Sequence, residues 1–175
     1  MKKTINIFWF RRDLRIEDNI GFAKALLGKH PVLPLFIFDS EILDDLPIDD
    51  ARVTFVFERI EELQKSLLEK GSSLSVHYGK PIEIFKLLVE EYDLQNVITN
   101  RDYETYGQNR DATVKDILAE KGVGFFSYKD HVIFERDDIV KTDGSPYVVY
   151  TPYMKKWKEQ FKAQIHLSVQ SLPNF

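Results

Sequence analysis

Two charged clusters in the sequence have the residue types of a binding site. The first, residues 11–15, places three arginines next to an aspartate. Such a cluster either binds an anion or forms a salt-bridged loop, and ion-pair networks are the commoner of the two. The second, residues 100–107, alternates the carboxylates Asp102 and Glu104. These carboxylates either accept hydrogen bonds from the N–H and hydroxyl groups of a planar heterocycle or belong to the entry of a helix.

Other patterns that carry chemistry are absent from the sequence. The chain has no cysteine, and its 4 histidines lack the spacing of metal ligands. No serine lies in a nucleophile-elbow motif, so a hydrolase triad is not supported. No glycine-rich dinucleotide or P-loop motif follows the first apolar run, which disfavours an ordinary pyrophosphate site. We therefore expect no catalytic residue and no metal site in this chain.

Apolar runs and helical periodicity indicate the elements that position the two clusters. Strands are predicted over residues 5–10, 32–38, 74–78, 96–99 and 124–128. Helices are predicted over residues 20–27, 51–70, 82–92 and 110–121. Strands separated by helices join as right-handed parallel crossovers, so the fold class is α/β: a Rossmann-like, doubly wound, five-stranded parallel sheet. Ligands bind such sheets at the carboxyl ends of the strands, where the segments following strands one, two and four should meet.

The pattern changes after the fifth predicted strand. Residues 133–150 predict an irregular hairpin, and residues 153–161 predict a helix with an aromatic stripe. Aromatic residues of both segments are expected to form an apolar surface, namely Tyr147, Tyr150, Tyr153, Trp157 and Phe161. We therefore divide the chain into an α/β domain, residues 1–130, and the start of an interdomain linker, residues 131–175, whose last residues lack periodicity.

Composition narrows the classes of partner. Lys and Arg number 24 against 28 Asp and Glu, a net charge of −4, so DNA binding by this segment alone is disfavoured. The N-terminal apolar run is interrupted by two arginines and lacks a cleavage site for a signal peptide. No stretch approaches the roughly 18 apolar residues that span a bilayer. We expect a soluble, cytoplasmic protein with no membrane partner.

The first cluster lies within a longer pattern that resembles a known family. Residues 9–19, read as WFRRDLRIEDN, are similar to the opening signature of the DNA photolyase/cryptochrome family, W-x-R-R-D-L-R-x-x-D-N. The resemblance continues through residues 35–39, 50–53, 100–111 and 146–153, and covers almost the whole chain. It implies the N-terminal α/β domain that binds a light-harvesting antenna pigment. In this family, a later helical domain holds FAD and receives the pyrimidine dimer of damaged DNA.

The resemblance implies a function for the chain and for its parent protein. The chain would be the antenna-chromophore-binding domain of a deoxyribodipyrimidine photo-lyase, a carbon–carbon lyase that repairs damaged DNA with light. FAD and DNA would be bound through the parent's helical domain. The chain alone is expected to bind no stoichiometric FAD and to repair no DNA. Its apolar surface is expected to lead either to self-association or to a disordered C-terminal tail. The alternatives are a cryptochrome-type blue-light receptor and, ranked last, a universal-stress or electron-transfer-flavoprotein-like nucleotide module.

The resemblance also implies which residues line the antenna pocket. They are Arg12, Phe36, Asp39, Arg52, Asp102 and Glu104. Asp102 and Glu104 would hold the ring of the pigment. Folate-binding members carry an Asn-Glu pair just after the fourth strand, where this chain has Tyr106 and Gly107. The resemblance therefore favours a deazaflavin or flavin over a folate, while the type of DNA lesion stays open.

Overall fold

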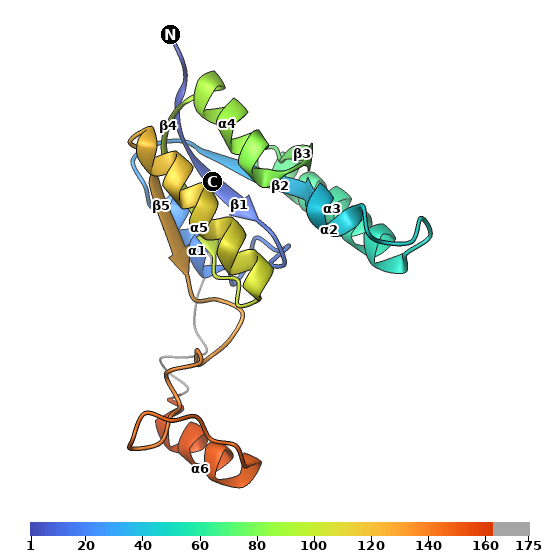
Figure 1. Ribbon diagram of the computed structural model, residues 1–175. Helices are drawn as coiled ribbons and strands as arrows, with labels where there is room; N and C mark the ends of the chain where they lie inside the picture. Colours follow the sequence, from blue (N-terminus) through green and yellow to red (C-terminus); the bar gives the residue numbers. More distant parts are fainter. Residues whose placement is uncertain (163–175) are drawn as a thin grey trace.

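The computed structural model describes residues 1–162 and consists of one parallel sheet, helices on both of its faces and a C-terminal helical segment (Figure 1). The strands are β1 (Thr4–Phe10), β2 (Val32–Asp39), β3 (Ser75–Gly79), β4 (Asp93–Asn100) and β5 (Gly124–Tyr128). The helices are α1 (Ile20–Leu26), α2 (Ser40–Leu43), α3 (Ala51–Glu69), α4 (Pro81–Glu91), α5 (Thr105–Glu120) and α6 (Tyr150–Gln160).

The order of the strands confirms the predicted doubly wound sheet. Five strands lie in the order β3-β2-β1-β4-β5, and all neighbouring pairs are parallel. The chain therefore builds outward from β1 to β3, returns, and builds outward again from β4 to β5. This reversal lies between β1 and β4, so the edge crevice of the sheet is expected beside the carboxyl end of β1.

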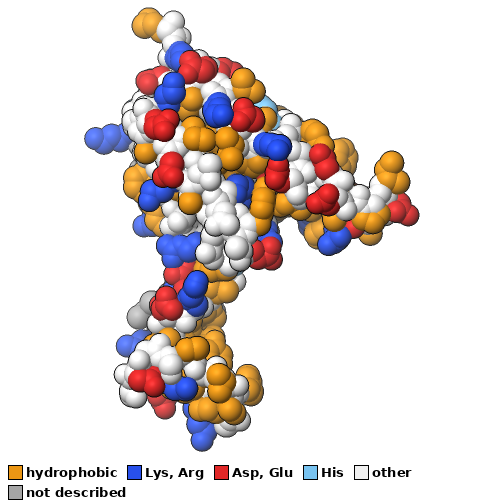
Figure 2. Space-filling view, viewed as in Figure 1, with side chains coloured by type: hydrophobic (Ala, Val, Ile, Leu, Met, Phe, Trp, Pro, Cys, Tyr) orange, Lys and Arg blue, Asp and Glu red, His pale blue; other side chains and the backbone are white. Residues whose placement is uncertain are grey.

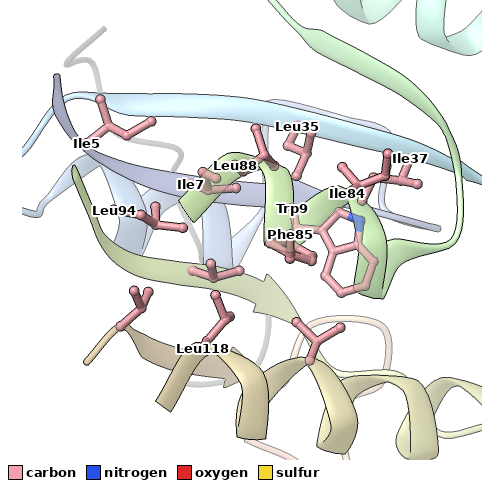
Figure 3. Packing of buried hydrophobic residues seen from close by; sticks show 13 residues of the cluster. Ile5, Ile7, Trp9, Leu35, Ile37, Ile84, Phe85, Leu88, Leu94 and Leu118 are labelled. Atoms are coloured by element: carbon pink, nitrogen blue, oxygen red, sulfur yellow. The ribbon is translucent and has the colours of Figure 1, made fainter. Parts of the chain in front are cut away.

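The central strand β1 is buried on both faces because its side chains alternate between two apolar clusters. Trp9 belongs to the cluster beneath α4 and α5, where its ring meets Phe85 edge-on at 5.0 Å between ring centroids (Figure 3). Phe8 belongs to the opposite cluster, beneath α1 and α3, and lies 5.1 Å from Phe22. This burial on both faces fixes the position of the residues that follow the end of β1.

Two helices next to the carboxyl edge differ from the sequence-based expectation. Helix α5 begins at Thr105, five residues before the predicted start at 110. The prediction missed the first turns because they carry polar residues and lack apolar periodicity. Helix α2, only 4 residues long, follows β2 directly where a loop was expected. The Asp39 carboxylate caps it by accepting a hydrogen bond from the Glu41 amide at 3.2 Å.

The irregular hairpin predicted over residues 133–150 is reduced to one antiparallel bridge, between Val140 and Pro146. A turn connects the two bridge residues: the Lys141 amide donates to the Ser145 carbonyl at 2.9 Å, and Gly144 adopts a φ of 81°. The division of the chain at residue 130 stays a prediction, and residues 163–175 of the expected linker lie outside the described residues.

Helix α6 stands apart from the sheet at the end of a long connection (Figure 1). Its Trp157 is half-buried and belongs to neither core cluster; the ring stacks on Phe161 at 5.0 Å and meets Phe134 edge-on at 5.4 Å. Tyr150 and Val148 are exposed, by 74% and 88%, and hydrophobic side chains gather on this lobe (Figure 2). Within residues 1–162, no helix combines the length and apolar character needed to cross a membrane.

A candidate ligand pocket at the carboxyl edge of the sheet

A cavity of about 370 Å³ lies where the segments following β1, β2 and β4 converge. The structure brings together all the residues predicted for the antenna pocket, because each of them lines this cavity: Arg12, Phe36, Asp39, Arg52, Asp102 and Glu104. They come from four segments of the chain and meet because parallel strands all end at one edge of the sheet. Contact of these side chains with a pigment stays a prediction.

One wall of the cavity is apolar. Phe36 and Phe38, at the end of β2, meet edge-on with their ring centroids 4.9 Å apart. Side chains from α2, the following loop and the start of α3 complete this wall: Ile42, Leu43, Leu46, Val53 and Val56. Sequence reasoning missed the contribution of α2, although the apolar residues at 42, 43 and 46 have helical spacing within an acidic segment. The wall offers an apolar surface beside the sheet.

The opposite wall is charged and centres on Arg110 of α5, which sequence reasoning did not single out. Its guanidinium is buried and lies 3.5 Å from Asp102 Oδ2, 3.7 Å from Asp39 Oδ2 and 3.0 Å from Asp111 Oδ1. The same group lies 4.8 Å from the ring centroid of Trp9. Arg110 thus holds two of the predicted pocket carboxylates in place. The signal for it was a single arginine in the first turns of a helix that starts beside the acidic cluster.

Tyr106 adds a second constraint on the charged wall. Its hydroxyl donates a hydrogen bond to Asp39 Oδ2 at 2.8 Å, and its ring lies 5.7 Å from the Arg110 guanidinium. Burial raises the pKa of Tyr106 well above its usual range, and the bond to Asp39 raises it further. The phenol therefore stays protonated and remains a donor. In the sequence, Tyr106 was noted only for its difference from folate-binding relatives.

Asp102 is held in its ionised form inside this wall. Burial raises the pKa of Asp102, but the hydrogen bond from the Glu104 amide and the charges of Arg11, Arg12 and Arg110 outweigh burial, so the net shift is downward. The carboxylate packs on Gly107, where an added Cβ would lie 2.4 Å from the Asp102 carboxyl group. Only glycine at position 107 allows this close approach.

Arg12, Arg52 and Glu104 lie at the mouth of the cavity and are more exposed. Arg12 and Glu104 form an ion pair at 2.6 Å, and both side chains are more than half exposed. Arg52 pairs with Asp50 at 2.6 Å, and Asp50 also caps α3. Hydrogen bonds from Arg52 lower the pKa of Asp50 to about 2. Glu104, unlike Asp102, therefore reaches a ligand only at the rim.

The other arginines of the first cluster have structural partners. Arg11 is nearly buried and binds both carboxylate oxygens of Asp111, at 2.5 and 2.6 Å. Arg15 pairs with Asp130 at 2.7 Å. The salt-bridged loop is thus the better description of these two residues, although Arg11 lines the cavity as Arg12 does.

One group of possible metal ligands occurs among residues 1–162, where the sequence spacing had suggested none. Asp13, Asp130 and His131 place ligand atoms within 4.8 Å of one another. However, Asp13 accepts hydrogen bonds from the amides of Asn19 and Asn100, and Asp130 accepts from Arg15 and the Ile20 amide. These bonds describe a polar network that fixes the start of α1.

A second depression, of about 450 Å³, lies between α5, β5 and residues 135–138. Of its 13 lining residues, 8 are charged. Glu135 accepts a hydrogen bond from Tyr103 at 2.8 Å and forms an ion pair with Arg101. Tyr103, Ala112 and Phe125 are the only aromatic or apolar side chains in this lining, so the first cavity, which has a larger apolar wall, is the better candidate site.

Fold and site together define a doubly wound α/β domain with a ligand pocket beside the reversal of strand order. The sequence model of the family described as "DNA photolyase" matches residues 6–173. The chain therefore belongs to the DNA photolyase family. It corresponds to the N-terminal α/β domain of these proteins.

Named relatives agree with this assignment. The chain is 35% identical over 156 residues to the deoxyribodipyrimidine photo-lyase of a Synechococcus species. This match covers 89% of this chain and 32% of that protein. It matches the crystal structure of a class III photolyase from Agrobacterium tumefaciens with a TM-score of 0.81 and 27% identity, over 92% of this chain and 33% of that one. The chain thus spans about a third of the length of these relatives.

A third relative is a photolyase from Sulfolobus tokodaii, described as an archaeal photolyase with two FAD molecules that imply a novel light-harvesting cofactor. The similarity has a TM-score of 0.67 and 31% identity, and covers 75% of this chain and 30% of that one. For that protein, two FAD molecules are thus reported.

Proposed function

We propose that this chain binds a flavin- or deazaflavin-type antenna pigment in the cavity between β1, β2 and the start of α5, as part of a light-driven DNA photolyase. The observation that carries the proposal is the pairing of an apolar wall with a carboxylate wall across about 370 Å³. A volume of that order is typical of small-molecule sites. The apolar wall would pack against the face of a fused ring, and the carboxylates would bind its polar edge.

Asp39 and Asp102 can still accept hydrogen bonds from a ligand. A carboxylate offers about four acceptor positions. Asp39 uses two for Tyr106 and the Glu41 amide, and Asp102 uses two for Arg110 and the Glu104 amide. Because the pKa of Asp102 is lowered, its carboxylate is ionised at neutral pH. A charge-assisted bond from a ring N–H would contribute about 1.5–3 kcal/mol.

The start of α5 supports a flavin-type ring over a folate. Position 107, where folate-binding relatives are expected to carry a carboxylate, is a glycine whose free space is filled by Asp102. The preceding Tyr106 points its hydroxyl at Asp39 and is engaged there. The Sulfolobus tokodaii relative, described with a second FAD, adds support for a flavin.

Titration of the chain with single pigments tests the proposal. Riboflavin, deazariboflavin and methenyltetrahydrofolate would be added separately, and binding followed by pigment fluorescence. We expect saturable binding of a flavin-type pigment that weakens about tenfold or more in Asp102→Asn, equivalent to about 1.4 kcal/mol per tenfold. Asp116→Asn, an exposed residue on the same helix, is the matched control. Binding of the folate alone, or of none of the three, would overturn the proposal.

Repair of damaged DNA is proposed for the parent protein and not for this chain alone. The relatives named as photo-lyases are about three times as long. The net charge of −4 also disfavours contact with the DNA backbone by this segment. Blue-light repair of dimer-containing DNA would be measured with the chain and with its full-length parent. Repair by the chain alone would contradict the proposal, and pigment binding without repair by the parent would favour the cryptochrome alternative.

We further propose that the exposed aromatic residues around α6 are a contact surface. Tyr150 and Val149 are exposed by 74% and 59%. Contiguous apolar patches of this kind mark interaction sites or lead to association. In the parent protein, the helical domain would cover them, and in the isolated chain a second copy would do so.

A further inference from the structure

The indole ring of Trp9 forms the buried inner end of the cavity. Trp9 is 1% exposed, yet it lines the cavity together with Ile37 and Asp39 of the neighbouring strand. Its ring is held firmly, because Phe85 meets it edge-on and two guanidinium groups, those of Arg11 and Arg110, lie 5.1 and 4.8 Å from the ring centroid. Figure 3 shows the ring at the end of β1, with its nitrogen on the side where Ile37 lies.

The Nε1–H group of this indole has no hydrogen-bond partner. It is the only buried side-chain nitrogen or oxygen in this condition among residues 1–162. Leaving a buried donor unsatisfied costs about 1–3 kcal/mol, and native proteins rarely tolerate it. Nearby buried polar groups are all engaged: Thr99 donates to the Trp9 carbonyl at 2.9 Å, and Asn100 donates to Asn19 at 2.8 Å. The unpaired donor thus belongs to a residue that lines the cavity.

We propose that Trp9 Nε1–H donates a hydrogen bond to a carbonyl oxygen or ring nitrogen at the inner end of the bound pigment. This inference rests on the proposed function, and it names the chemistry that the ligand must present. The carboxylates of Asp39 and Asp102 select a ring N–H, and Trp9 selects an acceptor next to it. An N–H flanked by carbonyl oxygens, as on the pyrimidinedione edge of a flavin or deazaflavin, satisfies both kinds of group. The pigment would then enter the cavity with this edge first.

Trp9→Phe tests the hydrogen bond because it removes the N–H and keeps an aromatic ring in the core. Affinity for riboflavin and deazariboflavin would be measured with the full 175-residue chain. We expect Trp9→Phe to weaken binding about tenfold, which corresponds to about 1.4 kcal/mol. The chain has 2 tryptophans, so Trp157→Phe, on the separate helix α6, is the matched control and should leave affinity unchanged.

Nuclear magnetic resonance on the wild-type chain provides a readout that does not depend on the variant folding. The two indole N–H signals are assigned by comparison with Trp157→Phe. We expect saturation with pigment to move the Trp9 signal downfield and to slow its exchange with solvent. An unmoved Trp9 signal at saturation, or equal affinity in folded Trp9→Phe, would overturn this inference alone. Failure of the wild type to bind any pigment would overturn the proposed function and this inference with it.

Discussion

At the scale of single residues, Arg110 fixes the positions of the side chains in the charged wall of the cavity. Its guanidinium is the cation that lies between Asp39 and Asp102, and all three side chains are about nine-tenths buried. Removal of the buried arginine leaves the negative charges of the carboxylates without a cation. The resulting loss of stability is far larger than the stability that the intact ion pair adds relative to apolar residues at the same positions. The residue therefore acts mainly by holding the two acids in place in the absence of ligand.

Arg110→Met should accordingly destabilise the fold. We expect the free energy of unfolding, from urea titration, to fall by about 3 kcal/mol, in the range known for broken buried pairs. Arg59→Met, which removes an exposed pair with Glu62 on α3, should change it by less than about 1 kcal/mol. Similar losses in the two variants would show that Arg110 is not a structural centre of the wall.

Tyr106 makes the stability of the folded protein depend on pH in the alkaline range. Its pKa is raised in the folded state, so the folded protein holds the phenolic proton more tightly than the unfolded chain. The stabilisation is fully present below the unfolded pKa of about 10 and is lost as pH rises above it. The difference in unfolding free energy between wild type and Tyr106→Phe should therefore shrink between about pH 9 and 11. A difference that stays constant over this range would contradict the prediction.

At the scale of elements, the start of α5 is where sequence and structure differ most. The strands were predictable because short apolar runs bounded by charged residues are typical of buried strands. The place of the cavity was predictable because ligands bind parallel sheets at the carboxyl ends of the strands. The early turns of α5 carry polar side chains directed at Asp39 and Asp102, so apolar periodicity begins only after them. Arg110, Trp9 and Tyr106 were missed for a related reason: a sequence does not show which side chains face the same cavity.

Gly107 makes the start of α5 sensitive to a single methyl group. On an open helix surface, glycine to alanine stabilises by about 1 kcal/mol. Here the new Cβ would lie 2.4 Å from the Asp102 carboxyl group and 2.9 Å from its Cβ, so the side chain must be displaced. We expect Gly107→Ala to lower the unfolding free energy by about 1–3 kcal/mol, the usual cost of overpacking, and to weaken pigment binding.

The double variant Asp102→Ala, Gly107→Ala separates crowding from a general defect of the helix. It removes the carboxyl group that meets the new methyl group, so the Gly107→Ala change should cost less in this background than in the wild type. Thermal unfolding measures this coupling. If the cost is the same in both backgrounds, the close approach to Asp102 is not its cause.

At the scale of the whole molecule, we expect the apolar residues around α6 to determine whether the chain associates with itself. We expect concentration-dependent self-association, measured by sedimentation or light scattering, because Val148 and Tyr150 are largely exposed on a lobe away from the sheet. Replacing both with serine should shift the chain toward monomer. Leu87→Ser, an isolated exposed leucine on α4, is the control that should not. A wild-type chain that is monomeric at all concentrations contradicts the prediction.

The strand order also determines when the sheet can be completed as the chain leaves the ribosome. β1 emerges first and finds β2 early, but its other edge waits for β4, about 90 residues later in the chain, as the pairing of Thr4 with Asp93 shows. Until then this largely apolar strand presents an open edge, the kind of surface that makes nascent chains prone to misassembly. The cavity completes later still, because Arg110 must follow. Loading of the proposed pigment would therefore be a late event of synthesis, and the cavity cannot guide the folding of the strands that build it.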